Sequence, residues 1–272
     1  MQGAGNDFIL IDNRRGIWPL DALHLRRWCD RRLGVGADQL LVLEETRRPD
    51  ADFRYRIFNA DGGEGEQCGN GARCMTRWVL ERIFPGECVR FETMRAVIRG
   101  SIGKDGLVSV EMGMPILEAD DLPFRTDGLS YCGGAWRGFG LSGTDELCVL
   151  AVGNPHAVRF GPMPEDEVFR RTGERLQDHP AFPEGINFEC VCPRSDSEAD
   201  FRVWERGVGE TPACGSGACA AAVAGMLTGR FGRTVTFHTR GGILRVRRPD
   251  PDGPVFLEGP AEYVFEGDLP LD

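Results

Sequence analysis

The pentapeptide that decides the fold occurs twice, as CGNGA at residues 68–72 and as CGSGA at residues 214–218. Each copy follows a strand-like tetrapeptide after eight intervening residues: RIFN at 56–59 and RVWE at 202–205. Both features repeat at a spacing of 146 positions (214 − 68 and 202 − 56). Because two features recur in register, the sequence indicates an internal duplication.

A third match supports the duplication: GNDF at residues 5–8 recurs as GNPH at 153–156. Each half is expected to open with an Asn-bearing strand and to continue with a strand of alternating apolar and polar residues. The Cys-Gly turn and a helix then follow. The expected strands are residues 8–11 and 53–57 in the first half and 157–160 and 201–203 in the second.

The two helices differ in composition. Met75, Val79 and Leu80 give the first an apolar face, whereas the second, residues 218–227, is almost wholly small and apolar and is expected to be buried. These elements predict an α+β fold of two pseudo-symmetric lobes, each a mostly antiparallel, barrel-like sheet around a central helix. The expected limits are 1–115 for the N-terminal lobe, 116–262 for the C-terminal lobe, and 263–272 for a segment that returns to the first.

Composition narrows the class of protein. The chain has 272 residues, 41% of them hydrophobic, and a net charge of −10. The charge argues against nucleic-acid or anionic-membrane binding, since both require a basic face. No apolar stretch approaches the ~18 residues of a membrane span, and the first ten residues do not resemble a signal peptide. We therefore expect a cytoplasmic protein that binds neither nucleic acid nor membranes.

Cysteine and lysine usage bears on cofactors. The ten cysteines fit zinc-ligand spacing only loosely, so no metal is expected. The only lysine, Lys104, lies in the turn sequence 103–106, whereas a Schiff-base lysine must sit at a desolvated cofactor site. The sequence therefore predicts no cofactor, and pyridoxal chemistry in particular is disfavoured.

The repeated turn indicates proton transfer. Glycines at the start of a helix leave backbone N–H groups free, and the positive end of the helix dipole attracts a carboxylate. The same environment is expected to lower the pKa of the adjacent thiol. A thiolate beside a bound carboxylate suits removal of the proton α to that carboxylate. Cys68 and Cys214, facing each other across an interlobe cleft, would then invert a stereocentre.

Two other interpretations of the cysteines are open. Both could be buried residues within a repeated structural turn. A cysteine hydrolase would need one Cys with a His partner, and duplication gives no reason for a second equivalent Cys.

Along nearly its whole length the sequence resembles the diaminopimelate epimerase family. The matching segments are 3–8 (GAGNDF), 34–39 (GVGADQ), 58–62 (FNADG), 67–74 (QCGNGARC), 153–156 (GNPH), 182–187 (FPEGIN), 205–211 (ERGVGET) and 213–217 (ACGSG). The combination is specific, although no single segment is.

The resemblance implies roles for particular residues. Cys68 and Cys214 would be the acid/base pair, with His156 and Glu205 orienting the thiols and the α-amino group. Backbone N–H groups of Gly69, Asn70, Gly215 and Ser216 would hold the reacting carboxylate. The implied substrate-binding side chains are Asn6, Gln39, Asn59, Asn154, Asn187 and Arg206.

The resemblance also implies an activity. It predicts a cofactor-independent isomerase that interconverts LL- and meso-2,6-diaminopimelate in lysine and peptidoglycan precursor synthesis. It further implies a cytoplasmic homodimer that takes a small amino-acid substrate.

Alternatives remain at this stage. A related racemase of another amino acid, such as histidine, would keep both cysteines but lose part of the distal polar set. A non-enzymatic amino-acid-binding or thiol redox protein would leave the matched pair unexplained. Asn6 and Asn154 could merely hold turns, His156 could be a core histidine, and Glu205 and Arg206 could pair with each other.

Oxidation is expected to join Cys68 to Cys214 and to stop activity, because the two lobes are expected to bring these thiols close together. Peptide mass spectrometry of the oxidised, inactive protein measures the crosslink. Inactive oxidised protein without this crosslink would contradict the prediction.

Overall fold

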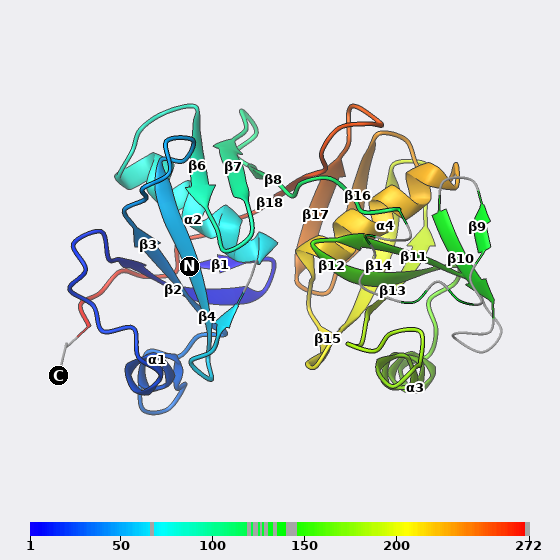
Figure 1. The fold of residues 1–272 in the computed structure, drawn as a ribbon, viewed down its shortest axis with the longest axis horizontal. Helices are drawn as coiled ribbons and strands as arrows, with labels where there is room; N and C mark the ends of the chain where they lie inside the picture. Colours follow the sequence, from blue (N-terminus) through cyan, green and yellow to red (C-terminus); the bar gives the residue numbers. More distant parts are fainter. Residues whose placement is uncertain are drawn as a thin grey trace. The chain divides into compact units, whose positions relative to one another are not determined.

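The computed structural model of the chain describes residues 1–65, 68–118, 121, 125, 127, 130–132, 135–139 and 146–269. The chain divides into two compact units, Met1–Glu111 with Glu258–Asp272, and Met112–Leu257 (Figure 1). Within the described residues, four helices and a large set of strands form an α+β fold, as the sequence predicted. The lobe limits expected from the sequence remain a prediction. The boundaries between the compact units lie a few residues earlier in the chain, after residues 111 and 257.

Unit 1 is built on a mostly antiparallel sheet. Its strands are β1 (Gln2–Gly3), β2 (Asn6–Asp12), β3 (Gln39–Glu44), β4 (Phe53–Asn59), β5 (Glu64–Gly65), β6 (Cys88–Glu92), β7 (Val97–Ile102) and β8 (Val108–Glu111). β2 runs parallel to β3, and β4 runs parallel to β6. The remaining pairs, β1–β2, β3–β4, β4–β5, β6–β7 and β7–β8, are antiparallel.

Unit 2 repeats this pairing. Its strands are β9 (Ser130–Cys132), β10 (Ala135–Phe139), β11 (Glu146–Val152), β12 (Asn154–Phe160), β13 (Asn187–Pro193), β14 (Glu198–Glu205), β15 (Gly209–Thr211), β16 (Thr234–Thr239) and β17 (Gly242–Arg247), and β18 (Phe256–Gly259) follows where the chain returns to unit 1. β12–β13 and β14–β16 are parallel, whereas β13–β14, β14–β15 and β16–β17 are antiparallel. The duplication seen in the sequence is therefore a duplication of sheet topology.

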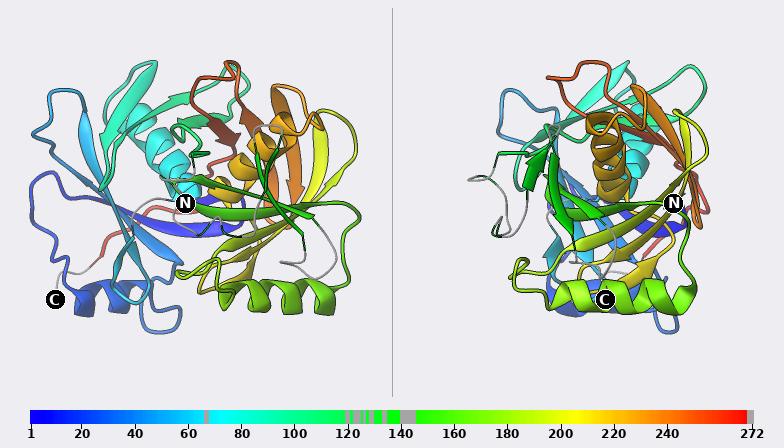
Figure 2. Two further views of the ribbon diagram at one scale, coloured as in Figure 1. Left: turned by 45° about the vertical axis from the view of Figure 1, so that its right-hand side comes forward. Right: turned by 90° about the vertical axis from the view of Figure 1, so that its right-hand side faces the viewer.

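Each unit has one buried helix at its centre. α2 (Gly69–Arg82) packs against β1, β2, β3, β6, β7 and β8, and α4 (Gly215–Leu227) packs against β11, β12, β13, β16 and β17. Because one helix touches strands from both ends of its sheet, each sheet curves around its helix. In both views of Figure 2, α4 (gold) is enclosed by strands of its own unit.

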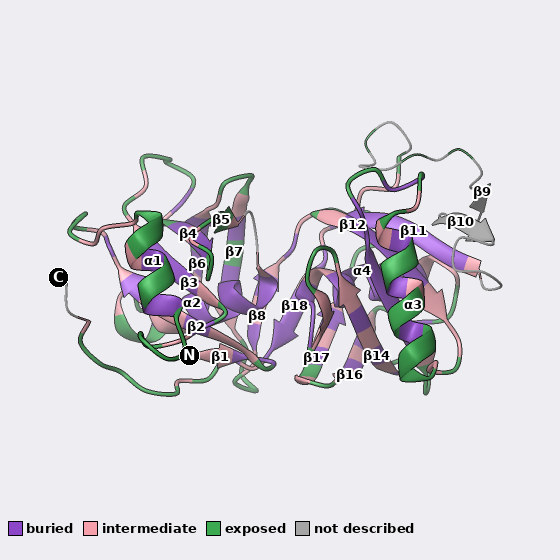
Figure 3. Cartoon of the chain, turned by 90° about the horizontal axis from the view of Figure 1, so that it is seen from below, coloured by how far each residue is buried: buried purple, intermediate pink, exposed green. Residues whose placement is uncertain are grey.

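The other two helices are peripheral. α1 (Ala22–Cys29) connects β2 to β3, and α3 (Asp166–Gln177) makes the equivalent connection from β12 to β13. Figure 3 shows their exposed outer faces. Asp21 caps α1 by accepting hydrogen bonds from the N–H groups of Leu23 and His24.

Small residues let α4 lie close to its sheet. Ala218, Ala220, Ala221, Ala222 and Ala224 are fully buried along the helix.

No helix in the described part of the chain combines the length and apolar character of a membrane span. Within the same residues, His, Cys, Asp and Glu side chains form no group of three or more that could hold a metal ion.

Replacing Gly225 by Ala is expected to destabilise the protein by about 1–3 kcal/mol, although Ala favours helix. An added Cβ would lie 2.1 Å from Cδ2 of Phe231, a buried ring packed against Phe160 and Phe237. Urea unfolding measures the effect. The matched control is Gly232→Ala, where the nearest atom is 3.8 Å away, and equal stability of the two variants would contradict the packing argument.

Candidate functional site

Cys68 is the N-cap residue of α2, with extended backbone angles (φ −137°, ψ 113°). Its Sγ accepts a hydrogen bond from the N–H of Gly71 at 3.4 Å, so the sulfur lies at the positive end of the helix. The thiol also lies 3.6 Å from Oδ1 of Asn6, to which it donates. The residue as a whole is half-buried.

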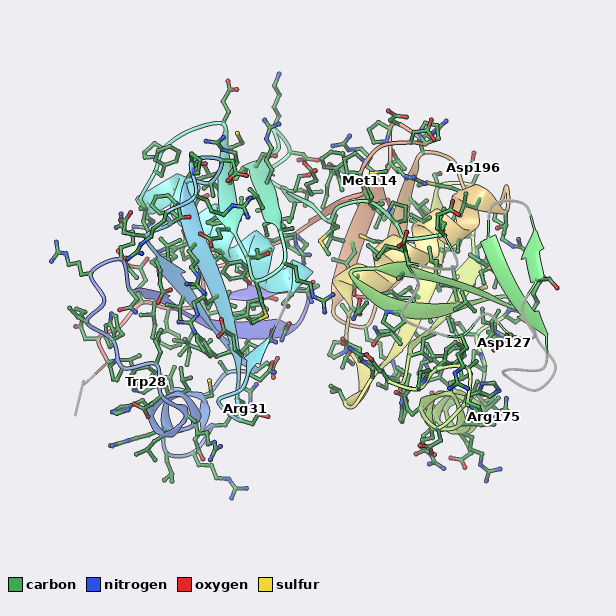
Figure 4. All side chains as sticks on the ribbon, viewed as in Figure 1. Trp28, Arg31, Met114, Asp127, Arg175 and Asp196 are labelled. Carbon is green, nitrogen blue, oxygen red and sulfur yellow. The ribbon has the colours of Figure 1, made fainter. Side chains whose placement is uncertain are left out.

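A chain of polar contacts holds Asn6 in this position. Asn6 Nδ2 donates to Oδ2 of Asp38 at 2.7 Å, and the other carboxylate oxygen of Asp38 accepts from Arg31 at 2.8 Å. Arg31, which lies just beyond α1 (Figure 4), also donates to both carboxylate oxygens of Asp7 at 2.8 Å. The guanidinium hydrogen bonds hold the pKa of the Asp7 carboxyl below its usual value.

Three other predicted residues lie in the same unit. Gln39 and Asn59 are directly opposite in the β3–β4 pair, and Gln39 Nε2 donates to Asn59 Oδ1 at 2.9 Å. Asn70 is buried, and its Oδ1 accepts from Arg73 at 3.0 Å. Arg73 is itself fully buried and also donates to the carbonyl oxygen of Gly69 at 3.4 Å. A buried cation therefore lies beside the first turn of α2.

Cys214 is the N-cap residue of α4 and is buried, with its Sγ 3.5 Å from Oγ of Ser216. Burial, together with the nearby carboxylates of Glu205 and Glu189, raises the pKa of the Cys214 thiol well above its usual value. The sequence argument, which expected the helix end to lower the pKa, is wrong for this residue. Loss of solvent and two nearby carboxylates outweigh the attraction of the helix N-terminus.

His156 is fully buried, and protein atoms contact both of its ring nitrogens. Nδ1 lies 2.6 Å from Oε1 of Glu189, and Nε2 lies 2.9 Å from Oδ1 of Asn154. The ring is therefore oriented from two sides. This geometry leaves neither ring nitrogen for direct contact with a substrate amine.

Glu189 was missed by the sequence analysis, although the sequence carries a signal. It lies in the middle of β13, NFECVCP, whose first five residues are all buried. A charged residue in a strand buried in this way is rarely found without a partner. Desolvation raises the pKa of the Glu189 carboxyl, whereas His156 acts in the opposite direction.

The predicted residues at the end of β14 have partners other than each other. Glu205 accepts a hydrogen bond from Oγ1 of Thr211. The backbone N–H of Arg206 donates to Asn187 Oδ1 at 2.9 Å, and its guanidinium donates to the carbonyl oxygen of Glu184 at 3.2 Å. Among the described residues, the suggested Glu205–Arg206 ion pair is not formed. Asn187 is buried and also donates to the carbonyl oxygen of Pro155 at 3.3 Å.

Each unit thus forms a half-site around its own N-cap cysteine. Cys68 is grouped with Asn6, and Cys214 is grouped with Ser216, Glu205 and Glu189. The two clusters occupy the same position in the repeated topology, at the start of the central helix.

Comparison with known proteins identifies the family. The sequence model of the diaminopimelate epimerase family matches residues 1–118 and 148–264. A diaminopimelate epimerase of Azotobacter vinelandii is 43% identical over 275 residues, covering 100% of this chain and 98% of the relative. One from Variovorax paradoxus is 43% identical over 281 residues, covering 99% and 96%.

Solved structures share the fold at low identity. A methylitaconate-delta-isomerase aligns with a TM-score of 0.65 at 12% identity, covering 98% of this chain and 92% of the other. A hydroxyproline epimerase from Agrobacterium vitis, with bound trans-4-hydroxy-L-proline, aligns with a TM-score of 0.62 at 14% identity, covering 95% and 86%. With the family matched over both units and its relatives aligned along the whole chain, this chain belongs to the diaminopimelate epimerase family of isomerases.

Proposed function

We propose that this enzyme interconverts LL- and meso-2,6-diaminopimelate by moving the Cα proton between Cys68 and Cys214. The observation that carries the proposal is the pair of cysteines at equivalent helix N-caps. A single thiol can remove a proton, but inversion needs a second acid that delivers a proton to the opposite face of the carbon. The duplicated half-site supplies one such group per unit.

The proposed reaction balances as two proton transfers. A thiolate takes the Cα proton, so one S–H bond forms as the C–H bond breaks. The electron pair left on the carbon is delocalised into the adjacent carboxylate, which the N–H groups of a helix N-terminus stabilise. The opposite thiol then gives its proton to the carbon and becomes the thiolate for the reverse direction.

The environment of Cys214 favours one starting arrangement. Because burial and two carboxylates raise the pKa of its thiol, Cys214 keeps its proton and is suited to be the acid. Cys68, half-buried and at the end of a helix that holds the buried cation Arg73, is suited to be the base.

The polar residues divide into ligands and supports. Arg206 has a partly exposed guanidinium (37%), which can take a carboxylate in a bidentate manner, and we assign it to the distal amino-acid end of the substrate. Asn6, Gln39, Asn59 and Asn154 supply amide groups for the same molecule. Asn187 is occupied by backbone partners, so we assign it to holding Arg206.

His156 and Glu205 act differently from the expectation. Because both ring nitrogens of His156 are engaged, we propose that it acts through Asn154 rather than on the amine directly. Glu205 contributes a negative charge that raises the pKa of Cys214.

We also propose a cytoplasmic location and a homodimer. The chemistry requires two free thiols, which a reducing compartment preserves. Sedimentation at several concentrations tests the dimer.

Two other functions are outcomes of the same experiments. A racemase of another amino acid would use both cysteines on a different substrate. An amino-acid-binding or thiol redox protein would use neither for proton transfer.

Incubation of LL-diaminopimelate in D₂O, without added cofactor, is expected to place deuterium at Cα together with formation of the meso isomer. The reason is that the incoming proton comes from a solvent-exchanged thiol. NMR at the α-carbon measures both events. Exchange only with another amino acid would replace the substrate, and no exchange with any amino acid would return the cysteines to a structural role.

Cys68→Ser and Cys214→Ser are each expected to lower kcat for epimerisation by roughly 10²–10⁴-fold, because an alcohol is a far weaker acid and its conjugate base is inaccessible. The matched controls are Cys88→Ser in unit 1 and Cys192→Ser in unit 2, both half-buried cysteines outside the half-sites. Near-normal turnover by either site variant would exclude the two-base mechanism.

A further inference from the structure

The half-site of Cys214 contains a buried carboxylate that the proposed proton transfer does not require. The side chains of Glu189 and His156 both have 0% exposure, and their contact at 2.6 Å joins β13 to β12. One oxygen, Oε1, meets Nδ1 of the ring. The other, Oε2, is buried and has no hydrogen-bond partner among the residues that the structure describes.

Glu189 also lies directly beneath the first turn of α4. A Cβ added to Gly217 would lie only 2.7 Å from Oε1 of Glu189 and 3.4 Å from Cβ of Cys214. The glycine therefore allows the carboxylate to approach the backbone of the turn that carries Cys214. A negative charge in this place opposes ionisation of the neighbouring thiol.

Unit 1 shows that the fold does not need this pair. In the parallel register of β2 with β3, the positions of His156 and Glu189 are taken by Phe8 and Leu41. Both are buried, and Leu41 Cδ2 lies 3.1 Å from where a Cβ of Gly71 would be. At these two positions unit 1 holds apolar side chains, whereas unit 2 holds a hydrogen-bonded His–Glu pair. The atom of unit 1 nearest to an added Cβ on Gly71 is the hydroxyl of Tyr55, at 2.7 Å.

We propose that Glu189 is a positioning residue for the step assigned to Cys214: it orients His156 by accepting its Nδ1–H and places a negative charge under the turn that begins α4. The proton-transfer step assigned to Cys214 rests on the proposed function. The geometry around Glu189 does not. Glu189 touches no reacting atom and acts through His156 and through its charge.

The orientation of His156 has a further consequence. The two atoms that the ring faces, Glu189 Oε1 and Asn154 Oδ1, are both acceptors. These two contacts set the plane and the rotation of the ring. Glu189 thereby fixes the ring, and the ring fixes the amide of Asn154, which we have assigned to the substrate.

The charged groups that face Cys214 come from three neighbouring elements. Glu205 lies at the end of β14, Glu189 lies on β13, and His156 on β12 contributes through Glu189. Burial and the two carboxylates raise the pKa of Cys214, and the hydrogen bond from Ser216 on its own helix lowers it. Removing the Glu189 charge is therefore expected to make Cys214 ionise at lower pH.

The test is Glu189→Gln, which keeps the shape of the side chain and removes the charge. The rate of Cys214 alkylation by iodoacetamide is measured against pH by peptide mass spectrometry, with Cys68 in the same sample as an internal reference. Steady-state kinetics with LL-diaminopimelate and thermal unfolding accompany it. The matched control is Glu198→Gln, which alters an exposed carboxylate 3.8 Å from His238 at the far end of β14.

In Glu189→Gln the alkylation curve of Cys214 is expected to move to lower pH by roughly one unit, while that of Cys68 stays unchanged. The kcat is expected to fall by about 10–100-fold, the range found when a functional histidine at a metal site loses its carboxylate partner, with little change in KM. Glu198→Gln should alter neither measurement.

Two results would overturn the proposal. One is an unchanged Cys214 curve with unchanged kcat. The other is an equal rise in reactivity of both thiols with a lower unfolding temperature, since this indicates general loosening.

If Glu189→Gln does not fold, Glu189→Leu takes its place, because Leu41 fills the equivalent position in unit 1. It should shift the Cys214 curve in the same direction, and an unshifted curve would contradict the proposal. Failure of the wild-type protein to exchange the α-protons of diaminopimelate would disprove the proposed function. The alkylation curves would still show whether the charge of Glu189 opposes ionisation of Cys214.

Discussion

The placement of a cysteine at the N-cap position of a buried helix is the constraint on which the rest of the structure depends. In each unit the curved sheet encloses one helix, so the helix N-terminus is fixed by packing on several sides. The glycines at the start of α2 and α4 let neighbouring side chains approach the backbone, as Tyr55 does at Gly71 and Glu189 at Gly217. The geometry of each half-site and the packing of the core are therefore set by the same turn.

Duplication preserved this backbone while the charges around it diverged. Unit 1 places the buried cation Arg73 near its cysteine, and the corresponding position 146 residues later is Cys219. Unit 2 instead places the anion Glu189 where unit 1 has Leu41. Equivalent thiols with different charged groups around their helix ends suit a reaction in which one must be a base while the other is an acid.

The sequence predicted much of this arrangement because the signals were local. Repeated motifs predicted the Cys-Gly turns, both central helices and the equivalence of the two units. The apolar composition of residues 218–227 predicted that the second helix is buried. The His156–Glu189 contact could not be predicted in the same way, since it depends on the register between β12 and β13. The pKa of Cys214 was predicted in the wrong direction because burial, which outweighs the helix dipole here, is a property of the tertiary structure.

The Glu189–His156 couple is difficult to explain as a stabilising feature. The cost of burying an ionisable pair can exceed the gain from its attraction, so such a pair is weak evidence for stability. The orphaned Oε2 adds a cost of about 1–3 kcal/mol, typical of a buried polar atom without a partner. Phe8 and Leu41 show that the same topology holds without a buried carboxylate at this position. The fold does not need the charge of Glu189 under the turn that carries Cys214. Its presence is accounted for by its effects on the ionisation of the thiol and on the orientation of the imidazole.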